Sequence, residues 1–371
     1  MAKSRKASAA MNERNGSVGA TATPRSLGFT MPAEWAKHDA IWLSWPYDPE
    51  TFPDRVDKAE LAYIEIISAI HTSEKVNLLV TSEDKQREVS RRLSARGVAP
   101  GRVEFHIFDY ADVWFRDYGP IFVTDAAGDR IAMTDWIFNA WGGKYEPLMK
   151  DNRIPAEMNR KLALQRFEPG IVLEGGSIDV NGRGALLTTE QCLLNPNRNP
   201  RLSRGEIEKY LLDYLGAEKI IWLKNGIEGD DTDGHIDDIA RFTGPNTVLC
   251  AAEPEKSDPN HDILEENFHI LKSASDQDGR PIDVIELPMP PPVSDDTAPL
   301  PASYTNFYIG NTVVLVPQFQ APETDERALK IIQSCFRERR CVGIDCSDLV
   351  HGLGTLHCIS QQQPSVFPPK R

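Results

Sequence analysis

The stretch Ala40-Ile41-Trp42-Leu43-Ser44 has the length and apolar composition of a buried β-strand, and Trp45-Pro46-Tyr47-Asp48 ends it. Apolar residues then recur at helical spacing, and shorter apolar runs follow. These patterns predict a helix, a strand, a polar amphipathic helix and another strand at residues 55–73, 76–80, 84–96 and 103–107. A β-α-β-α-β order of this kind is typical of an α/β fold.

The same rhythm continues along the rest of the chain. We predict further strands at residues 171–173, 185–188, 220–223, 247–251, 282–287, 312–316 and 342–344. Helices are expected at 203–215, 260–274 and 323–337, and the first of them opens with the capping box Ser203-Arg204-Gly205-Glu206. Since no shift in composition divides this part, residues 28–371 are predicted to form one α/β domain. Residues 1–27 are basic and nearly free of aromatic residues, which indicates a disordered tail.

Composition and charge narrow the class of partner. The 371 residues are 40% hydrophobic and 26% charged, which is typical of a globular protein. The net charge of -14 disfavours binding to nucleic acid or to an anionic membrane, because both require a cationic surface. No run of about 18 apolar residues is present, so no transmembrane helix is predicted. An acidic protein of this kind would suit a cationic small substrate.

The cysteines do not form a recognisable framework. Six are scattered through the chain, at positions 192, 250, 335, 341, 346 and 358. Their spacing fits neither a set of disulfides nor a zinc ribbon. Reduced thiols are the simpler explanation, and we therefore expect a cytoplasmic location.

Five stretches combine glycine with acid, amide or thiol groups near the ends of predicted strands. Their key positions recur roughly every 50–70 residues, a spacing that suggests one site element per structural unit. The five stretches are residues 114–120, 174–177, 231–238, 306–311 and 351–364. Because the stretches show no similarity residue by residue, their spacing alone suggests a repeat.

Cys358 follows a glycine-rich turn in the stretch His351-Gly352-Leu353-Gly354-Thr355-Leu356-His357-Cys358. Most cysteines are small buried apolar residues, whereas a nucleophilic cysteine needs a thiolate supported by positive charge and a base. Several acids around one thiol would raise its pKa unless the substrate itself were a cation. A planar guanidinium, which carboxylates bind as a fork, would meet this need. Cys358 is therefore our candidate nucleophile, and a guanidinium is the candidate substrate group.

The acidic residues 230–238 allow several interpretations. Their density is typical of a metal loop, but the EF-hand spacing is absent because no Glu stands at the required place. His235 and Asp237 are two residues apart, which on a strand places both side chains on one face. A histidine beside a carboxylate suits general acid/base chemistry or half of a cation site. A solvated turn leading into a strand explains the same residues, and this stretch alone does not decide.

Two further acids stand out. Asp117 lies between Arg116 and a Gly-Pro turn, where a surface ion pair explains it as well as a function does. Glu174 follows the apolar run 171–173 and precedes two glycines. A carboxylate at the end of a buried strand is costly unless it is paired, so we expect Glu174 to have a partner, for which His235 is a candidate, or a ligand.

Together these motifs resemble the agmatine deiminase and bacterial-type (Porphyromonas-type) peptidylarginine deiminase family of the guanidino-group-modifying, or pentein, superfamily. The resemblance covers residues 30–364, and its specificity lies in the order of motifs that are individually weak. The matching motifs are Trp114-Phe-Arg-Asp117-x-Gly-Pro, Asp135-Trp-x-Phe-Asn-Ala-Trp-Gly-Gly143, Leu173-Glu-Gly-Gly-Ser177, Leu193-Leu-Asn195 with Arg198-Asn-Pro200, Asp231-Thr-Asp-Gly-His-Ile-Asp237, Ala302-Ser-Tyr-x-Asn-Phe-Tyr308, and His357-Cys358 followed by Gln361-Gln-Gln-Pro364.

The resemblance implies a fold and a set of roles. The fold would be a five-bladed α/β propeller with a pseudo-fivefold axis and the site at its centre. Cys358 would be the nucleophile, His235 the general acid/base, and Glu174 the acid that orients the histidine. The substrate-binding residues would be two carboxylates that hold the guanidinium and one aromatic wall, namely Asp117, Asp237 and Trp114.

The implied reaction is hydrolysis of the agmatine guanidinium to N-carbamoylputrescine and ammonia, a step of putrescine biosynthesis. It would proceed through a covalent thiouronium intermediate on the cysteine. The implied partner is a small cationic guanidino substrate, with no metal and no organic cofactor, no nucleic acid and no membrane. A homo-oligomer is compatible with the sequence, which does not specify one.

One departure from the family pattern bears on the substrate. The well-studied plant-like members have a Gly-Gly-Gly-Asn-Ile run before His-Cys, whereas this chain has residues 352–356 as Gly-Leu-Gly-Thr-Leu. A peptidylarginine or free-arginine deiminase is therefore an alternative with the same chemistry. An amidinotransferase would have to exclude water from the intermediate. Two more remote alternatives are a non-catalytic guanidine-binding protein and a metal-dependent hydrolase built on residues 230–238.

Overall fold

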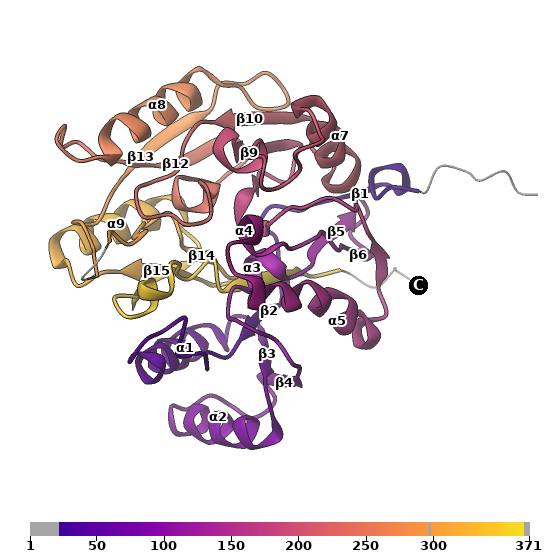
Figure 1. Ribbon diagram of the computed structural model, residues 1–371, viewed down its shortest axis with the longest axis vertical. Coiled ribbons are helices and arrows are strands. Elements are labelled where there is room, and N and C mark those ends of the chain that lie inside the picture. The colour runs from indigo at the N-terminus through magenta and orange to yellow at the C-terminus, as the bar shows by residue number, and fades with distance from the viewer. Residues whose placement is uncertain (1–21, 296–297, 367–371) are drawn as a thin grey trace, which may run out of the picture.

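The computed structural model describes residues 22–295 and 298–366, and the fold is a mixed arrangement of helices and β-sheets (Figure 1). Within these ranges the chain forms five sheets. In the view of Figure 1, strands of all five sheets are distributed around the short helix α3 (Phe115–Tyr118). The mixed α/β class expected from the sequence is confirmed.

The start of the chain departs from the expected tail. Residues 1–21 of that tail lie outside the described residues. Nearer the domain, Arg25–Leu27 form the 3-10 helix η1, and the N–H of Phe29 donates to the Pro24 carbonyl at 2.9 Å. The backbone hydrogen bonding of the domain therefore begins before residue 28, which we predicted as its boundary.

Three sheets follow one connection pattern. Two antiparallel strands are followed by a helix and then by a strand parallel to the second of the pair. This is the repeating unit that the spacing of the five glycine-containing stretches suggested. The strands are β8 (Asp179–Val180), β9 (Ala185–Thr189) and β10 (Lys219–Leu223); β11 (Ala240–Phe242), β12 (Thr247–Ala252) and β13 (Asp283–Pro288); and β14 (Tyr308–Ile309), β15 (Val313–Gln318) and β16 (Arg340–Asp345). The connecting helices are α7 (Arg204–Leu215), α8 (Asn260–Ser273) and α9 (Pro322–Cys335).

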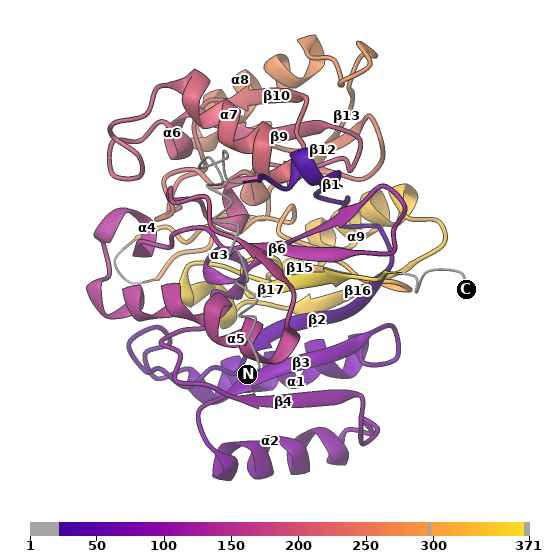
Figure 2. The same cartoon turned by 90° about the vertical axis from the view of Figure 1, so that its right-hand side faces the viewer.

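The two four-stranded sheets extend the same pattern. One has the order β1-β5-β6-β7, with strands Phe29–Thr30, Ile121–Asp125, Ile131–Thr134 and Gln165–Phe167 and the crossing helix α5 (Ile154–Leu162). The other has the order β17-β2-β3-β4, with strands Ser360–Pro364, His38–Ser44, Lys75–Val80 and Val103–Ile107 and the crossing helices α1 (Val56–Ile70) and α2 (Glu83–Ala95). In Figure 2 helix α2 lies beyond β4, at the outer edge of this sheet. Pairing of β17 with β2 joins the two ends of the domain and fixes the segment that carries Cys358.

The local sequence signals explain these elements. Six of the seven residues of β2 are buried, which is why it reads as a continuous apolar run rather than an alternating one. Helix α7 opens with the predicted capping box at Ser203 and Glu206, and it ends at Gly216, whose φ of 73° is left-handed. Short helical segments complete the chain: α4 (Ala140–Gly143), η2 (Glu146–Arg153), η3 (Gly175–Ser177), α6 (Glu190–Leu193), η4 (Ile236–Asp238) and η5 (Leu349–Gly352).

The expected strand at residues 171–173 is wrong. Only one isolated bridge, between Val172 and Ile137, is present there. The side chain of Asn199 takes over part of the pairing, since it accepts from the Val172 N–H at 3.0 Å and donates to its carbonyl at 2.8 Å. The apolar run is buried, but its backbone partners are a side-chain amide and a bridge rather than a neighbouring strand.

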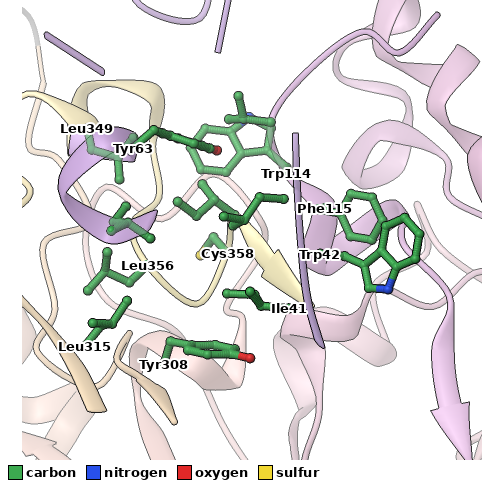
Figure 3. Packing of buried hydrophobic residues seen from close by; sticks show 14 of the residues in the cluster. Ile41, Trp42, Tyr63, Trp114, Phe115, Tyr308, Leu315, Leu349, Leu356 and Cys358 are labelled. Atoms are coloured by element: carbon green, nitrogen blue, oxygen red, sulfur yellow. The ribbon is translucent and has the colours of Figure 1, made fainter. Parts of the chain in front are cut away.

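The main hydrophobic cluster reaches the site. Trp42 stacks on Phe115 with ring centroids 6.0 Å apart, and both residues belong to the same cluster as Trp114 and Cys358 (Figure 3). Two further clusters underlie the sheets of β8 to β10 and β11 to β13. The candidate nucleophile therefore lies at the edge of a close-packed core, where displacement of a side chain is resisted.

Candidate active site

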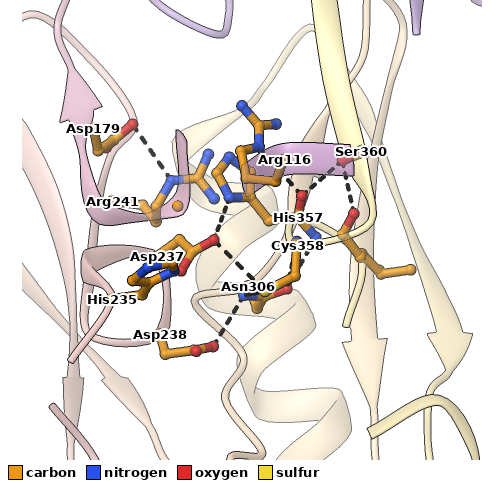
Figure 4. Close-up of polar contacts among 12 residues, drawn as sticks. Arg116, Asp179, His235, Asp237, Asp238, Arg241, Asn306, His357, Cys358 and Ser360 are labelled. Atoms are coloured by element: carbon orange, nitrogen blue, oxygen red, sulfur yellow. Dashed lines mark hydrogen bonds and ion pairs between the residues drawn. The ribbon is translucent and has the colours of Figure 1, made fainter. Parts of the chain in front are cut away.

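Cys358 lies between η5 and β17, and its side chain is buried. The side-chain amide of Asn306 donates to its Sγ at 3.0 Å, and Oδ2 of Asp237 lies 3.7 Å from the sulfur (Figure 4). The Oδ1 atom of Asn306 accepts the backbone N–H groups of His357 and Cys358 at 2.9 and 3.3 Å. A single amide therefore holds both the thiol and the backbone that carries it.

The glycine-rich turn has a steric reason. A Cβ atom on Gly354 would meet Cζ3 of Trp114 at 2.5 Å and Sγ of Cys358 at 3.2 Å. Only glycine leaves room for the indole and the thiol at this point. In the same turn, Leu353 adopts a left-handed φ of 75°, which is a strained backbone conformation for a residue other than glycine. The glycine-rich run before Cys358 therefore lets the backbone pass close to the indole and the thiol.

Asp117 is held by two donors at the buried end of α3. Its Oδ2 accepts the indole N–H of Trp141 at 2.9 Å, and its Oδ1 accepts the N–H of Gly176 at 3.0 Å. Burial and the nearby charges of Asp237 and Glu174 raise its pKa well above the ordinary value. A cation bound beside Asp117 would favour its charged form. The surface ion pair with Arg116 that we considered is not what the side chain makes.

Gly176 provides the surface on which three groups meet. A Cβ atom there would lie 2.6 Å from Nδ1 of His235, 2.8 Å from Oδ1 of Asp117 and 3.1 Å from Oδ2 of Asp237. The glycine of the Glu174-Gly-Gly motif is therefore needed for these side chains to approach one another. Three of the five glycine-containing stretches thus come together around one backbone atom.

His235 precedes the 3-10 helix η4 and does not lie on a strand, which corrects our expectation that His235 and Asp237 share a strand face. Its Nδ1 lies 3.7 Å from Oδ1 of Asp117. Neither ring nitrogen has a hydrogen-bond partner among the described residues. Burial, assisted by the positive charges of Arg198 and His357, lowers its pKa to about 3. The imidazole is therefore neutral at physiological pH and free to accept a proton.

Glu174 pairs with an arginine. Its Oε1 accepts from Nε of Arg198 at 2.6 Å, and both side chains are fully buried. Glu174 and His235 each have an atom within 4.8 Å of the other, but no hydrogen bond joins them. Arg198 also donates to Oδ2 of Asp233 at 2.6 Å and to the Thr232 carbonyl at 2.8 Å. Glu174 therefore has a partner, but this is Arg198 rather than our candidate His235, and Arg198 ties Glu174 to the loop that carries His235.

Asp237 and Asp238 differ in charge state. Oδ2 of Asp237 accepts from Nδ1 of His357 at 2.7 Å, whereas its Oδ1 has no partner in the described part of the chain. Burial alone would raise the pKa of Asp237, but the hydrogen bond and charge of His357 lower it below the ordinary value. Asp238 accepts from Asn306 at 2.9 Å, and burial together with the charge of Asp237 raises its pKa well above normal.

The surroundings of Cys358 favour the protonated thiol over the thiolate. Burial and the carboxylates of Asp237, Asp238 and Asp117 raise its pKa well above the ordinary value, against the opposing hydrogen bond from Asn306. A cation bound among the same carboxylates would lower it again. The sequence argument, that acids around this thiol make sense with a cationic substrate, matches the electrostatics of the site.

In the acidic loop at residues 230–238, two carboxylates accept hydrogen bonds from the loop backbone or from neighbouring side chains. Asp230 accepts the N–H groups of Thr232, Gly234 and His235 at 2.7, 2.8 and 3.0 Å. Asp231 accepts from Lys144 and Tyr145. These contacts shape the loop that presents His235 and leave these two carboxylates poorly suited to bind a metal ion. They weaken the metal-dependent alternative.

A cavity of about 290 Å³ opens onto the thiol. Its inner end is formed by Cys358, Asp117 and Trp114, and the indole N–H of Trp114 donates to Oδ2 of Asp112 at 3.0 Å. The remaining lining combines carboxylates with aromatic and aliphatic side chains, namely Asp48, Glu50, Thr51, Asp112, Trp141, Tyr145, Pro147, Leu148, Asp231, Thr232, His351, Gly352 and Leu353. The space suits an elongated cation with an apolar middle.

Several residues of the site were not among our candidates. Asn306 and Asp238 stand within the glycine-containing stretches, and Arg198 and Trp141 stand within motifs that carried the family resemblance. Their residue type gave no separate signal, because a buried amide or a second aspartate is also common in turns. Glu34 and His357 form a further buried pair at 2.9 Å, and Glu34 lies outside every marked stretch.

The fold and the site together define a mixed α/β protein in which a buried cysteine, a buried histidine and several carboxylates lie close together, and the cysteine and some of the carboxylates line a cavity. The chain belongs to the Porphyromonas-type peptidyl-arginine deiminase family, whose profile matches residues 30–364. A Legionella pneumophila (strain Paris) protein is 42% identical over 346 residues, covering 93% of this chain and 98% of that protein.

Named relatives agree with this assignment. The agmatine deiminase of Medicago truncatula is 38% identical, over 93% of this chain and 98% of its own length. Among solved structures, the agmatine deiminase of Enterococcus faecalis superimposes with a TM-score of 0.87 at 33% identity, covering 93% of this chain and 98% of that one. Because both chains are covered almost completely, the likeness extends to the whole domain.

Proposed function

We propose that this chain is an agmatine deiminase, a hydrolase that converts the guanidinium of agmatine and water to N-carbamoylputrescine and ammonia. The observation that carries the proposal is the Cys358 thiol at the end of a cavity, beside Asp117, Asp237 and the neutral His235. The names of the Medicago truncatula and Enterococcus faecalis relatives support the same substrate. Such an enzyme would serve putrescine biosynthesis, and we propose that it does so in the cytoplasm.

In the first half of the reaction, Asp117 and the free Oδ1 of Asp237 accept hydrogen bonds from the guanidinium. The bound cation favours loss of the Cys358 proton, which passes to the neutral imidazole of His235. The sulfur forms a bond to the central guanidinium carbon, and one terminal C–N bond breaks. His235 returns the proton to the departing nitrogen, which leaves as ammonia, and an S-alkylthiouronium remains on the cysteine.

In the second half, His235 takes a proton from a water molecule that attacks the thiouronium carbon. The C–S bond breaks and the ureido product leaves; the proton on His235 restores the thiol, and the second proton of the water is lost from the product oxygen and ends on the released ammonia as ammonium. Trp114 forms one wall of the cavity and Glu174 fixes the His235 loop through Arg198. The asparagine that donates to Sγ stabilises the thiolate in both halves.

Carboxylates along the cavity favour agmatine over arginine. Asp48, Glu50 and Asp112 line the cavity together with apolar side chains. A buried carboxylate such as Asp112, whose pKa burial raises to about 7, gains from a cationic neighbour. The second ammonium group of agmatine would supply that cation, whereas the α-carboxylate of arginine would be repelled. Peptidylarginine remains the second candidate because of the family to which the chain belongs.

We also propose that the five sheets are the blades of a five-bladed α/β propeller with a pseudo-fivefold axis through the site. The shared connection pattern of the sheets and the pairing of β17 with β2, which closes the chain on itself, support this arrangement. The partner of the enzyme would be the small guanidino substrate, and a homo-oligomer is compatible with the proposal.

The test compares ammonia release from agmatine, free arginine and a blocked arginine peptide, each with the unaltered chain and with Cys358→Ala. Agmatine should be the preferred substrate, and the variant should lose at least about a thousandfold in kcat. Cys341→Ala, at a thiol that does not line the cavity, serves as the matched control and should stay active. Substantial turnover by Cys358→Ala would eliminate the mechanism, while preference for the peptide would replace agmatine with peptidylarginine.

A further inference from the structure

The residue next to the nucleophile makes an unusual pair of contacts. Nδ1 of His357 lies 2.7 Å from Oδ2 of Asp237 (Figure 4). Its Nε2 lies 2.9 Å from Oε2 of Glu34. All three side chains are almost completely buried. One imidazole therefore bridges two carboxylates, one of which belongs to the substrate site.

Counting protons fixes the charge of this bridge. An ionised carboxylate only accepts, and a neutral imidazole donates from one nitrogen and accepts at the other. Burial alone would raise the pKa of Glu34, but the charges of Arg241 and His357 bring it well below the ordinary value. The pKa of Asp237 is also lowered, chiefly by His357. A carboxylate oxygen accepts from the ring only where the facing nitrogen carries a proton, so the two short contacts together are those of a ring that donates from both nitrogens, an imidazolium.

The bridge is the middle of a chain of alternating charge. Arg241 donates to Oε2 of Glu34, and the backbone N–H of Ile309 donates to its Oε1 at 2.7 Å. The order Arg241, Glu34, His357, Asp237 is therefore plus, minus, plus, minus. Oδ2 of the last member, Asp237, lies 3.7 Å from the thiol sulfur, and its Oδ1 has no partner among the described residues, so the substrate guanidinium would supply the next positive charge.

We propose that His357 is a positioning residue that stays protonated and, braced by Glu34, holds Asp237 charged and turned so that its Oδ1 faces the substrate. The inference rests on the proposed function for its substrate. His357 itself touches neither the substrate nor the reacting atoms; it acts through Asp237. The two histidines of the site thus have different parts in this proposal, a base at His235 and a donor to two carboxylates at His357.

Other charged and titratable groups face this chain from every element packed against it. Like charges at Asp117 and Asp238 oppose ionisation of Asp237, whereas positive groups favour it. The groups that face the chain are Arg116, Asp117, Asp179, His235, Asp238, Arg241, Tyr308 and Cys358. With two more carboxylates so close, Asp237 depends on a fixed cation to remain the charged member.

The direction in which the pH profile should move follows from the pKa of Asp237. A depressed pKa of Asp237 keeps the carboxylate ionised down to low pH, so removal of the imidazolium should raise that pKa. In His357→Gln and Glu34→Gln, the acidic limb of the pH profile of kcat/KM for agmatine should move up by about one pH unit or more. KM should rise by about tenfold at neutral pH, while kcat above the shifted limb falls less. A purely structural role would lower stability without moving the limb.

The chain contains a matched control. His38 and Glu74 form another buried histidine–carboxylate pair, with Nδ1 and Oε2 2.9 Å apart, and neither lines the cavity. His38→Gln should destabilise the protein to a similar degree and leave the acidic limb in place. An unmoved limb in folded His357→Gln and Glu34→Gln would overturn the proposal, as would an equal shift in His38→Gln.

A second measurement does not depend on catalysis. In the unaltered chain labelled with ¹⁵N at histidine, one ring should show the two protonated-nitrogen shifts of an imidazolium, and Glu34→Gln should perturb that ring. If all rings titrate or are neutral at pH 8, the proposal fails even if agmatine is turned over. If the imidazolium is present but no guanidino substrate is hydrolysed, the charge assignment stands and the proposed function fails instead.

Discussion

Asn306 binds Cys358 at two places: its Nδ2 donates to Sγ at 3.0 Å, and its Oδ1 accepts the backbone N–H at 3.3 Å. The same Nδ2 also donates to Oδ1 of Asp238 at 2.9 Å. The amide therefore stabilises the thiolate, shapes the turn before it and orders a neighbouring carboxylate.

Replacing Asn306 with alanine should remove both contacts at once. A hydrogen bond to a charged group contributes about 1.5–3 kcal/mol, so kcat/KM for agmatine should fall by about 10- to 100-fold. Asn267→Ala is the matched control, because Asn267 is equally buried and anchors the backbone of Lys224 and Asn225 away from the cavity. That control should lose stability but keep its kcat. Equal kinetic loss in both variants would mean that Asn306 acts through folding alone.

Gly176→Ala should strongly lower kcat/KM without unfolding the protein. The added Cβ would press on His235 and Asp117 from 2.6 and 2.8 Å, and neither side chain has room to withdraw. We expect kcat/KM to fall by about 100-fold or more, because small displacements of reacting groups are expensive. Gly205→Ala in helix α7 meets nothing within 4 Å and should be neutral or stabilising by up to about 1 kcal/mol. Full activity of Gly176→Ala would refute this geometry.

The raised pKa of Cys358 predicts a slow thiol in the free enzyme. A group whose pKa is raised remains protonated until the pH exceeds that value, so alkylation by the neutral reagent iodoacetamide should still be accelerating above pH 9. Asp238→Asn removes one nearby carboxylate and should shift the curve down by about one pH unit. The rate of loss of activity, measured from pH 6 to 11, reports both. A plateau below pH 8 in the unaltered chain would contradict the expectation.

Asp112→Asn should weaken binding of the distal ammonium group of agmatine and leave binding of its guanidinium unchanged. If Asp112 binds the distal ammonium group, KM for agmatine should rise by about tenfold, while KM for butylguanidine, which lacks that group, changes little. The asparagine can still accept the indole N–H of Trp114, so the wall of the cavity is preserved. Steady-state kinetics with the two substrates are compared. A parallel loss for both would show that Asp112 acts only through Trp114.

The buried ion pair of Glu174 and Arg198 should contribute more to the free energy of unfolding than a surface ion pair does. Arg198→Met leaves a buried carboxylate without its cation, which should cost about 3–5 kcal/mol of unfolding free energy. Burial already raises the pKa of Glu174 against the charge of Arg198, so the loss should shrink as the pH falls and the acid is protonated. Lys209→Ala, which breaks the surface pair with Asp213, should cost less than about 0.5 kcal/mol. Denaturant unfolding measures both.

The sequence predicted the positions of helices and strands better than it predicted the contacts between distant residues. Strand β4 has the bounds expected from its apolar run, and α7 begins at the capping box because both signals depend on residues a few positions apart. Residues 171–173 were wrongly expected to form a strand, since the partner that replaced the ladder is the side chain of Asn199. Nothing in a local pattern specifies such a substitution.

By itself the sequence determined the α/β class, the recurring glycine-containing stretches and the match to a family that fixes Cys358, His235, Glu174, Asp117, Asp237 and Trp114 as candidates. Only the tertiary structure decided how these groups are charged and held. Asn306 reaches Cys358 across 52 residues, and Glu34 reaches His357 across 323. Charge state in a buried site depends on burial and on all neighbouring charges, and packing of distant segments sets both. The sequence therefore names candidate reacting groups, whereas the fold sets the burial and the neighbouring charges on which their protonation depends.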